Sequence, residues 1–222
     1  MIYFYYTDSN YLSVNGKSST IREEVYNQII HIPYTNRFIT NRLGFTKSID
    51  ISIDFKNDTD FNAFVSKLDS IVKISFDGIK YFDAFYNGGN SKKLMWAGIY
   101  TPNVFTFLLS GLAYSLVEYS KNGGVNLPNS GNYPSTPKFT ITGAHNLIKI
   151  SDGTRELQFQ YSTSDGDTIE IENWKVFVNG EEKTQYLSGD FPLIPVGSTF
   201  QFTLTGLNNN EITIKYRDTW RW

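Results

Sequence analysis

The sequence contains no cysteine, and it has only two histidines and two methionines among its 222 residues. A chain without thiols can form neither a disulfide nor a thiolate metal site, and it has no cysteine nucleophile. Charged residues make up 19% of the chain and the net charge is −2, so no broad basic field attracts nucleic acid. We therefore expect no specific nucleic-acid partner.

Long hydrophobic runs are also absent. The most apolar window, residues 104–117, is interrupted by Thr106, Ser110 and Ser115 and is shorter than the ~20 residues that a membrane helix requires. The N-terminus lacks the basic segment and the apolar stretch of a signal peptide. We expect synthesis in the cytoplasm and no membrane partner.

Aromatic residues, in contrast, are abundant. They make up 16% of the chain, with 17 Phe and 15 Tyr, and these residue types favour strands. Hydrophobic residues reach 40%, which is a globular balance. The length predicts one or two domains, and a domain of ~150 residues already buries roughly 70% of its unfolded surface. The composition therefore predicts a mainly β protein with a sizeable core.

The clearest strand pattern lies in the stretch 166–216. Ile169 and Ile171 alternate with Thr168, Glu170 and Glu172, which is the pattern of a half-buried strand. Asn-Gly at 179–180 supplies the positive φ of a two-residue hairpin turn. The segment 186–197 is rich in Pro and Gly, so we expect a shaped loop there. Further strands are predicted at 139–141, 147–150, 157–161, 175–178, 200–204 and 212–216.

The N-terminal half predicts a sheet with one helix. Residues 49–55 alternate Ile and Phe with polar residues, and Asp58 or Thr59 can cap a helix over about 60–72. Apolar residues recur there at helical spacing, so the helix is expected to cover the sheet with one face. That stripe comprises Phe61, Phe64, Val65, Leu68, Ile71 and Val72. Other strands are expected at 2–6, 74–76, 79–81, 94–100 and 104–109, with a loop at 87–91.

A boundary is predicted where Gly, Pro and Asn accumulate without apolar periodicity, at residues 121–137. We assign residues 1–125 to an α+β N-terminal domain, 126–137 to a linker and 138–222 to a C-terminal β-sandwich of jelly-roll type. The predicted fold class is mainly β.

No catalytic, cofactor-binding or metal-binding set emerges from the sequence. His31 and His145 stand alone, and one histidine without partner residues makes neither a triad nor a metal site. Both are interpreted as structural histidines. No nucleophile elbow, zinc-binding helix or phosphate-binding glycine loop occurs. We expect no enzymatic activity.

Two groups of acidic residues are candidates for a catalytic pair and for a calcium site. Glu170 and Glu172 share a strand face about 7 Å apart, a separation that glycoside hydrolases use, but alternation with Ile indicates a solvated sheet face. Asp165 and Asp167 flank a glycine as in a calcium loop, yet the other ligands are missing, so a turn is the better interpretation.

Three tryptophans are candidates for stacking on a sugar: Trp174, Trp220 and Trp222. The plainer interpretation places Trp174 in the core and the other two in terminal or interface packing. Both alternatives stay open at this point, because neither a fold nor an aromatic residue alone establishes sugar binding.

Four segments together resemble the C-terminal domain of the distal tail proteins (Dit family) of long-tailed phages. They are 166–171 (Gly-Asp-Thr-Ile-Glu-Ile), 176–180 (Val-Phe-Val-Asn-Gly), 187–195 (Leu-Ser-Gly-Asp-Phe-Pro-Leu-Ile-Pro) and 212–220 (Ile-Thr-Ile-Lys-Tyr-Arg-Asp-Thr-Trp). The resemblance extends over residues 139–220, whereas the first half is similar only in its expected architecture. It implies a structural protein with a galectin-like C-terminal sandwich and no cofactor.

The resemblance also implies the protein's surroundings. Six copies would form a ring at the distal end of the tail of the virion, around a channel for DNA. The ring would join the tail tube protein to the tail tip protein, and a receptor-binding protein is a further candidate partner. The alternative from another class is a carbohydrate-binding adhesion module that recognises the host cell wall.

Overall fold

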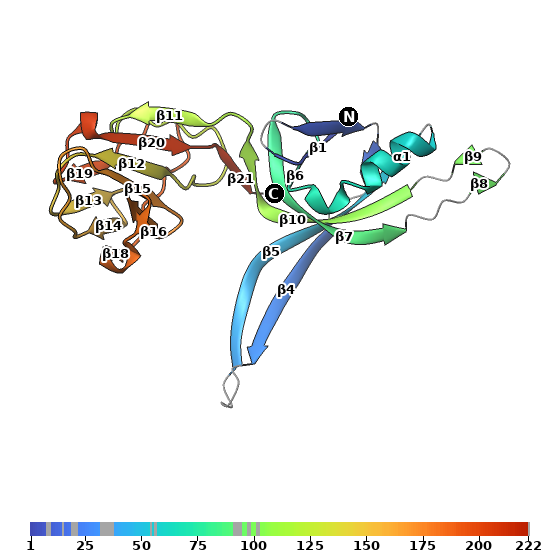
Figure 1. Ribbon diagram of the computed structural model, residues 1–222, viewed down its shortest axis with the longest axis horizontal. Helices are drawn as coiled ribbons and strands as arrows, with labels where there is room; N and C mark the ends of the chain where they lie inside the picture. Colours follow the sequence, from blue (N-terminus) through green and yellow to red (C-terminus); the bar gives the residue numbers. More distant parts are fainter. Residues whose placement is uncertain are drawn as a thin grey trace. The chain divides into compact units, whose positions relative to one another are not determined.

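The computed structural model describes residues 1–7, 10–14, 16–18, 22–31, 38–53, 55, 57–90, 95–96, 99–100 and 103–221 (Figure 1). The chain divides into two compact units, Met1–Ala113 and Tyr114–Arg221. Antiparallel strands build both units, so the predicted mainly β class is confirmed.

The N-terminal unit is organised around one antiparallel sheet with the order β2-β1-β6-β7-β10-β5-β3. Alternation decides which face is buried: Ile49 and Ile51 of β5 lie opposite Phe107 and Phe105 of β10, and all four are at most 2% exposed. The strands are β1 (Ile2–Tyr5), β2 (Tyr11–Val14), β3 (Gly16–Ser18), β5 (Phe38–Ile53), β6 (Lys73–Ser75), β7 (Lys80–Asn90) and β10 (Asn103–Ser115).

A long hairpin extends from this sheet. β4 (Arg22–His31) pairs with β5 from Arg22 opposite Ser48 to His31 opposite Phe38, with a register shift after Val25 (Figure 1). Only the end of β5 from Lys47 onward also pairs with β10. Among the described strands, residues 38–46 of β5 thus pair with β4 alone, which leaves both outer edges of the hairpin open.

The predicted helix forms, but it is shorter than expected. α1 (Asp58–Val65) is followed by the 3₁₀ turn η1 (Leu68–Ser70). The N-cap is Asn57, one residue before the first predicted cap Asp58, because the Asp60 N–H donates to Asn57 Oδ1 at 2.8 Å. It cannot continue to residue 72, because the Val72 N–H donates to the Tyr5 carbonyl of the sheet at 2.9 Å. Val72 is accordingly 46% exposed and does not belong to the buried stripe.

Phe64 is the residue through which α1 packs on the sheet. Its ring centroid lies 5.1 Å from that of Phe4, 5.5 Å from Phe55 and 5.0 Å from Phe105, and the residue is fully buried. The contacts with Phe4 and Phe105 are edge-to-face, a geometry that adds to the hydrophobic gain. The helix therefore covers the buried face of the sheet, as the sequence pattern predicts.

Two N-terminal expectations are wrong. The loop expected at 87–91 is strand up to Asn90, because β7 continues through both glycines. The single strand expected at 94–100 is instead a pair of short strands, β8 (Met95–Trp96) and β9 (Ile99–Tyr100), of which Met95 lies opposite Tyr100. Alternation alone does not reveal where a strand folds back on itself.

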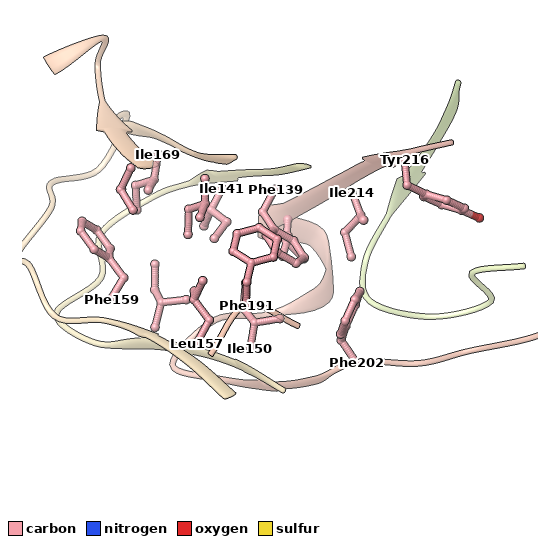
Figure 2. Packing of buried hydrophobic residues seen from close by; sticks show 14 of the residues in the cluster. Phe139, Ile141, Ile150, Leu157, Phe159, Ile169, Phe191, Phe202, Ile214 and Tyr216 are labelled. Atoms are coloured by element: carbon pink, nitrogen blue, oxygen red, sulfur yellow. The ribbon is translucent and has the colours of Figure 1, made fainter. Parts of the chain in front are cut away.

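The C-terminal unit is a sandwich of two antiparallel sheets. Their inward faces meet in one core, where Ile141 and Ile169 from one sheet lie opposite Ile150 and Leu157 from the other (Figure 2). The first sheet, in spatial order, contains β11 (Tyr119–Asn122), β20 (Ile212–Tyr216), β12 (Lys138–Thr142), β15 (Thr168–Glu172), β16 (Lys175–Val178) and β17 (Glu181–Glu182). The second contains β18 (Leu187–Gly189), β14 (Glu156–Phe159), β13 (Ile148–Ser151) and β19 (Thr203–Thr205).

Residues 126–137 lie inside the C-terminal unit. Leu127 is fully buried in the sandwich core, and isolated bridges join Asn129 to Gly197, Tyr133 to Thr219 and Ser135 to Ile194. The Pro and Gly residues thus shape an irregular edge of the sandwich. The strand expected at 200–204 is displaced to β19, because residues 200 and 202 bond to this edge instead: the Leu127 N–H donates to the Phe200 carbonyl at 3.0 Å and the Phe202 N–H to the Gly124 carbonyl at 2.8 Å.

Replacing Phe64 tests the aromatic contact between helix and sheet. Phe64→Ala should leave a cavity and lower the free energy of unfolding by about 3–5 kcal/mol. The matched control is Asn62→Ala, on the exposed face of α1, which should change it by less than about 0.5 kcal/mol. Urea unfolding of both variants measures this, and equal effects would contradict the packing described.

Two fragments test where the C-terminal unit begins. A fragment of residues 114–222 should unfold cooperatively, because it keeps β11, Leu127 and the bridges of residues 129–135. A fragment of residues 138–222 loses all of these and should unfold at a clearly lower temperature. Calorimetry compares them, and equal stability would support a boundary at residue 138.

Candidate functional site

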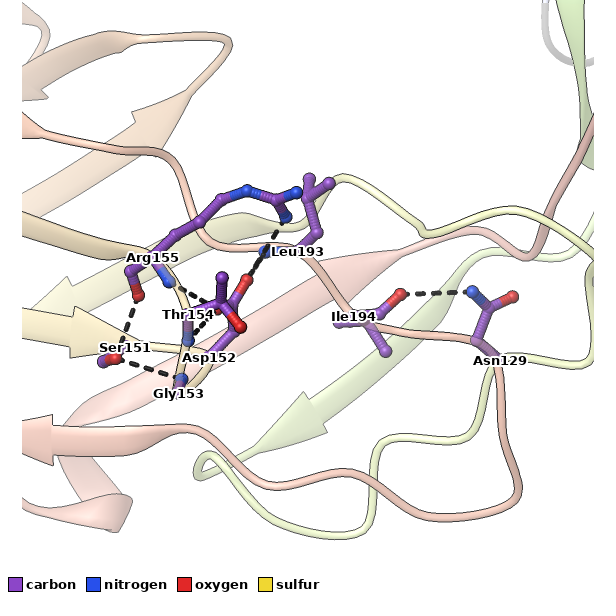
Figure 3. Close-up of polar contacts among 8 residues, drawn as sticks. All are labelled: Asn129, Ser151, Asp152, Gly153, Thr154, Arg155, Leu193 and Ile194. Carbon is purple, nitrogen blue, oxygen red and sulfur yellow. Dashed lines mark hydrogen bonds and ion pairs between the residues drawn. The ribbon is translucent and has the colours of Figure 1, made fainter.

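The loops at one edge of the C-terminal sandwich are tied together by a buried carboxylate. Asp152 follows β13, and its side chain is 7% exposed. Its Oδ1 accepts the N–H groups of Thr154 at 2.9 Å and Arg155 at 2.7 Å (Figure 3). Its Oδ2 accepts the Leu193 N–H at 2.9 Å and lies 3.4 Å from Arg155 Nη1. One carboxylate thus fixes the turn after β13 and the distant loop that contains Leu193.

Two opposing effects act on the pKa of Asp152. Burial raises the pKa. The N–H groups of Leu193, Arg155 and Thr154 and the charge of Arg155 together lower it by more than burial raises it, so the pKa lies below its ordinary value. The carboxylate is therefore ionised at neutral pH, where charge-assisted hydrogen bonds are strongest.

Asn129 ties the same loop from the other side. Its Nδ2 donates to the Tyr133 carbonyl at 2.9 Å and to the Ile194 carbonyl at 3.2 Å, while its Oδ1 accepts the Gly131 N–H at 3.0 Å (Figure 3). A side chain at Gly131 would overlap the Thr219 backbone. The loop of residues 190–197 is thereby held by side chains from two other segments.

A hollow of about 410 Å³ opens beside these loops, lined by Thr136, Arg155, Asn173, Trp174, Asp190, Phe191 and Leu193. Trp174 occupies the turn between β15 and β16 and is 49% exposed. Its ring centroid lies 5.8 Å from that of Phe191, which is buried in the core. The core position expected for Trp174 is therefore wrong: its side chain rests on the core and remains half exposed.

His145 is a structural histidine, as its isolation in the sequence predicts. It is 6% exposed, with Nδ1 2.9 Å from the Gly206 carbonyl oxygen and Nε2 3.2 Å from that of Thr142. Both ring nitrogens are occupied by backbone groups. His31 ends β4, and its side chain lies outside the described residues.

The acidic residues of β15 and of the turn before it make local contacts. Glu170 and Glu172 are exposed on β15, and Lys138 Nζ lies 4.0 Å from the first and 3.3 Å from the second. Asp167 forms a turn, because its carboxylate accepts the Ser164 N–H at 2.7 Å and an Asn179 amide hydrogen at 2.8 Å. Within the described residues, no group of three or more His, Asp or Glu could hold a metal ion.

The other two tryptophans proposed as sugar-stacking residues do not line the hollow as the structure describes it. Trp220 lies in β21 (Thr219–Arg221) and is partly buried, whereas Trp222 lies outside the described residues. No helix in the described part of the chain is long and apolar enough to cross a membrane.

Sequence reasoning missed Asp152, Arg155 and Asn129. Asp152-Gly153 is a turn signal, but a turn signal does not reveal that the carboxylate also binds Leu193, 41 residues further along the chain. These residues could have been found only through the contact between the two loops.

The C-terminal unit matches a known family. Residues 130–220 match the family described as siphovirus-type tail component, C-terminal domain. No curated protein sequence matches the chain. The match defines the C-terminal unit as a domain of a phage tail component.

Solved structures are similar over nearly the whole chain. The Dit protein (gp 19.1) of phage SPP1, described as a paradigm of the hub adsorption apparatus in phages that infect Gram-positive bacteria, is 11% identical with a TM-score of 0.55, over 92% of this chain and 93% of that one. A chain of the phage p2 baseplate in its activated conformation with Sr is 10% identical with a TM-score of 0.47, over 96% and 97%. The family match covers the segments whose sequence motifs resemble the C-terminal domain of distal tail proteins, so that resemblance is confirmed for residues 130–220, and the similarity to solved structures shows the fold of the remainder.

Substitution of Asp152 tests the loop network. Asp152→Ala leaves three N–H groups without their acceptor and should lower the free energy of unfolding by at least about 2 kcal/mol. Asp152→Asn keeps one acceptor oxygen and should cost less. Asp165→Asn, in an exposed turn, is the control and should change little. Chemical denaturation at pH 7 measures all three.

The effect should depend on pH in a defined direction. Because the folded-state pKa of Asp152 is lowered, its stabilisation is present above the unfolded pKa of roughly 3.9 and is lost as pH falls through the folded value. The stability difference between the parent and Asp152→Asn should therefore shrink below about pH 4. A difference that stays constant down to pH 2 would contradict this account.

Proposed function

We propose that this chain forms a homo-oligomeric ring of six copies at the distal end of a phage tail and joins the tail tube to the tip or baseplate. The match of residues 130–220 to the C-terminal domain of siphovirus-type tail components supports a structural role in the tail. The observation that carries the proposal is the family match of the C-terminal unit, together with the fold of the whole chain.

The N-terminal unit offers surfaces suited to contacts between copies. Phe85 is 68% exposed, Ile79 65% and Tyr11 56%. Exposed aromatic and aliphatic side chains of this size are favoured in interface cores. In β7, Phe85 alternates with Tyr86, whose ring lies 5.6 Å from that of Phe107. Phe85 therefore points away from the core, where a neighbouring copy can cover it.

A ring uses heterologous contacts, in which one patch of each copy meets a different patch of the next. The net charge of −2 provides little repulsion between copies. We infer that the N-terminal unit carries the assembly, whereas the C-terminal unit has a complete core of its own and is monomeric in isolation.

The remaining assignments rest on the match of the C-terminal unit to a phage tail component. We infer that the protein has no enzymatic activity and that its partners are the tail tube protein, the tail tip protein and a receptor-binding protein. It would belong to the virion, at the end of the tail, with the phage DNA passing through the ring without specific contacts.

The oligomeric state tests the ring directly. Light scattering should give the full chain a mass far above 25.4 kDa, alone or after a tail partner is added. Phe85→Ser should weaken the assembly and leave the fold unchanged. Val117→Ser is the matched control, because Val117 has a similar exposure of 65% but belongs to the C-terminal unit.

Each result bears on a different part of the proposal. An assembly unaffected by Phe85→Ser would show that β7 does not form the contact. A chain that stays at 25.4 kDa even with tail partners present would overturn the ring. In that case, the adhesion-module alternative would become the leading hypothesis.

A further inference from the structure

We propose that the hollow beside Trp174 binds one uncharged sugar ring of a polysaccharide. This function goes beyond the structural role in the tail, and it belongs to the C-terminal unit alone, since every lining residue lies within residues 136–193. The argument begins with the backbone that presents the tryptophan.

Two successive hairpins of the first sheet share strand β16 and provide an internal comparison. The turn at Asn179-Gly180 has φ of 51° and 83°, and the turn at Asn173-Trp174 has φ of 49° and 64°. Both are two-residue turns, because Val178 lies opposite Glu181 and Glu172 opposite Lys175. Such turns require positive φ at both positions, where Asn-Gly is the preferred pair.

A tryptophan at the second position is therefore unfavourable for the turn itself. A bulky residue with positive φ is a genuine outlier, and such outliers cluster at functional sites. Glycine would serve the backbone better, as it does at Gly180 in the neighbouring hairpin. The gain that retains Trp174 must come from its side chain.

The side chain offers a supported but incompletely covered aromatic surface. Trp174 is tilted by 51° against Phe191 with ring centroids 5.8 Å apart, and Phe191 is only 5% exposed. Contact with the core fixes the indole, while 49% of the residue remains exposed beside the hollow. An aromatic side chain presented in this way can stack against the C–H face of a sugar.

The polar residues around the indole include hydrogen-bond donors and acceptors, and one residue of each charge sign. Arg155 and Asn173 supply N–H donors, whereas Asp190, Asn173 and Thr136 supply oxygen acceptors. One positive and one negative charge line the hollow, so it carries no net charge that would select an ion. Hydroxyl groups both donate and accept, so an uncharged sugar ring suits this lining.

The hollow is built on fixed parts. Asp152 holds the backbone of both Arg155 and Leu193 and contacts the Arg155 guanidinium at 3.4 Å (Figure 3). The volume of the hollow, about 410 Å³, lies at the small end of the ~300–1,000 Å³ range of ligand sites. A small, preformed hollow with a single aromatic platform fits one ring of a chain better than a protein interface, which needs a much larger surface.

The experiment uses the full chain and saturation-transfer NMR with the methyl glycosides of glucose, galactose, N-acetylglucosamine and rhamnose. At least one glycoside should receive saturation, with an affinity in the millimolar range expected of so small a ligand. Trp174→Gly should weaken that binding at least tenfold. Because glycine suits the turn, the unfolding temperature should stay within about 5 °C of the parent.

Two further variants decide whether the hollow is the site. Trp174→Phe keeps an aromatic ring and should retain part of the binding, which guards against misfolding of the glycine variant. Tyr186→Ala removes another exposed aromatic residue, beside a second hollow lined by Gln160, Gln185, Leu187 and Ser188, and should leave binding unchanged.

Three results would overturn the proposal. The first is that no glycoside receives saturation. The second is that Trp174→Gly binds as the parent does, and the third is that Tyr186→Ala abolishes binding while Trp174→Gly preserves it. None of these results affects the ring, which is tested separately by the mass of the assembly and by Phe85→Ser.

Discussion

The structure depends on one constraint: each unit must bury one face of its strands while the backbone of every connecting loop still finds hydrogen-bond partners. In the C-terminal unit, the two sheets meet that constraint with a core of Ile, Leu and Phe. The loops meet it with side chains, since Asp152 accepts the N–H groups of two segments and Asn129 bridges the carbonyls of Tyr133 and Ile194. These two residues allow an irregular loop to lie against a regular core while the Leu193 N–H and the Ile194 carbonyl remain hydrogen-bonded.

Alternation is a local property, which is why the sequence predicts strands β12, β15 and β20 so well. The limits of other elements are set by contacts that no local pattern contains. The helix cannot extend to residue 72 because that residue joins the sheet through its bond to Tyr5. The Gly- and Pro-rich segment 126–137 belongs to the sandwich because Leu127 enters its core. Residues that break regular structure mark the end of a strand, but they do not distinguish a linker from an irregular edge.

In the candidate site, too, some features follow from the local sequence and others depend on contacts between distant segments. The roles of His145 and of the pair Glu170 and Glu172 follow from their sequence surroundings, since an isolated histidine and an alternating strand each point to a structural role. The hollow beside Trp174 does not follow from the sequence, because its lining comes from four separate segments that only the folded sandwich brings together. The turn Asn173-Trp174 carried a signal, however, since two polar-flanked residues between alternating strands predict a tight turn in which tryptophan is unexpected.

A residue that conflicts with its local backbone is more informative than a buried residue whose role burial already explains. The hairpins on either side of β16 have the same loop length and positive φ at both turn positions, so the requirements of the turn do not account for glycine in one and tryptophan in the other. Packing on Phe191 accounts for the covered half of Trp174. The exposed half contributes nothing to the core, yet it stands beside a hollow that is also lined by Arg155, Asn173 and Asp190. A ligand that stacks on the indole and exchanges hydrogen bonds with those groups would explain both the residue and its place.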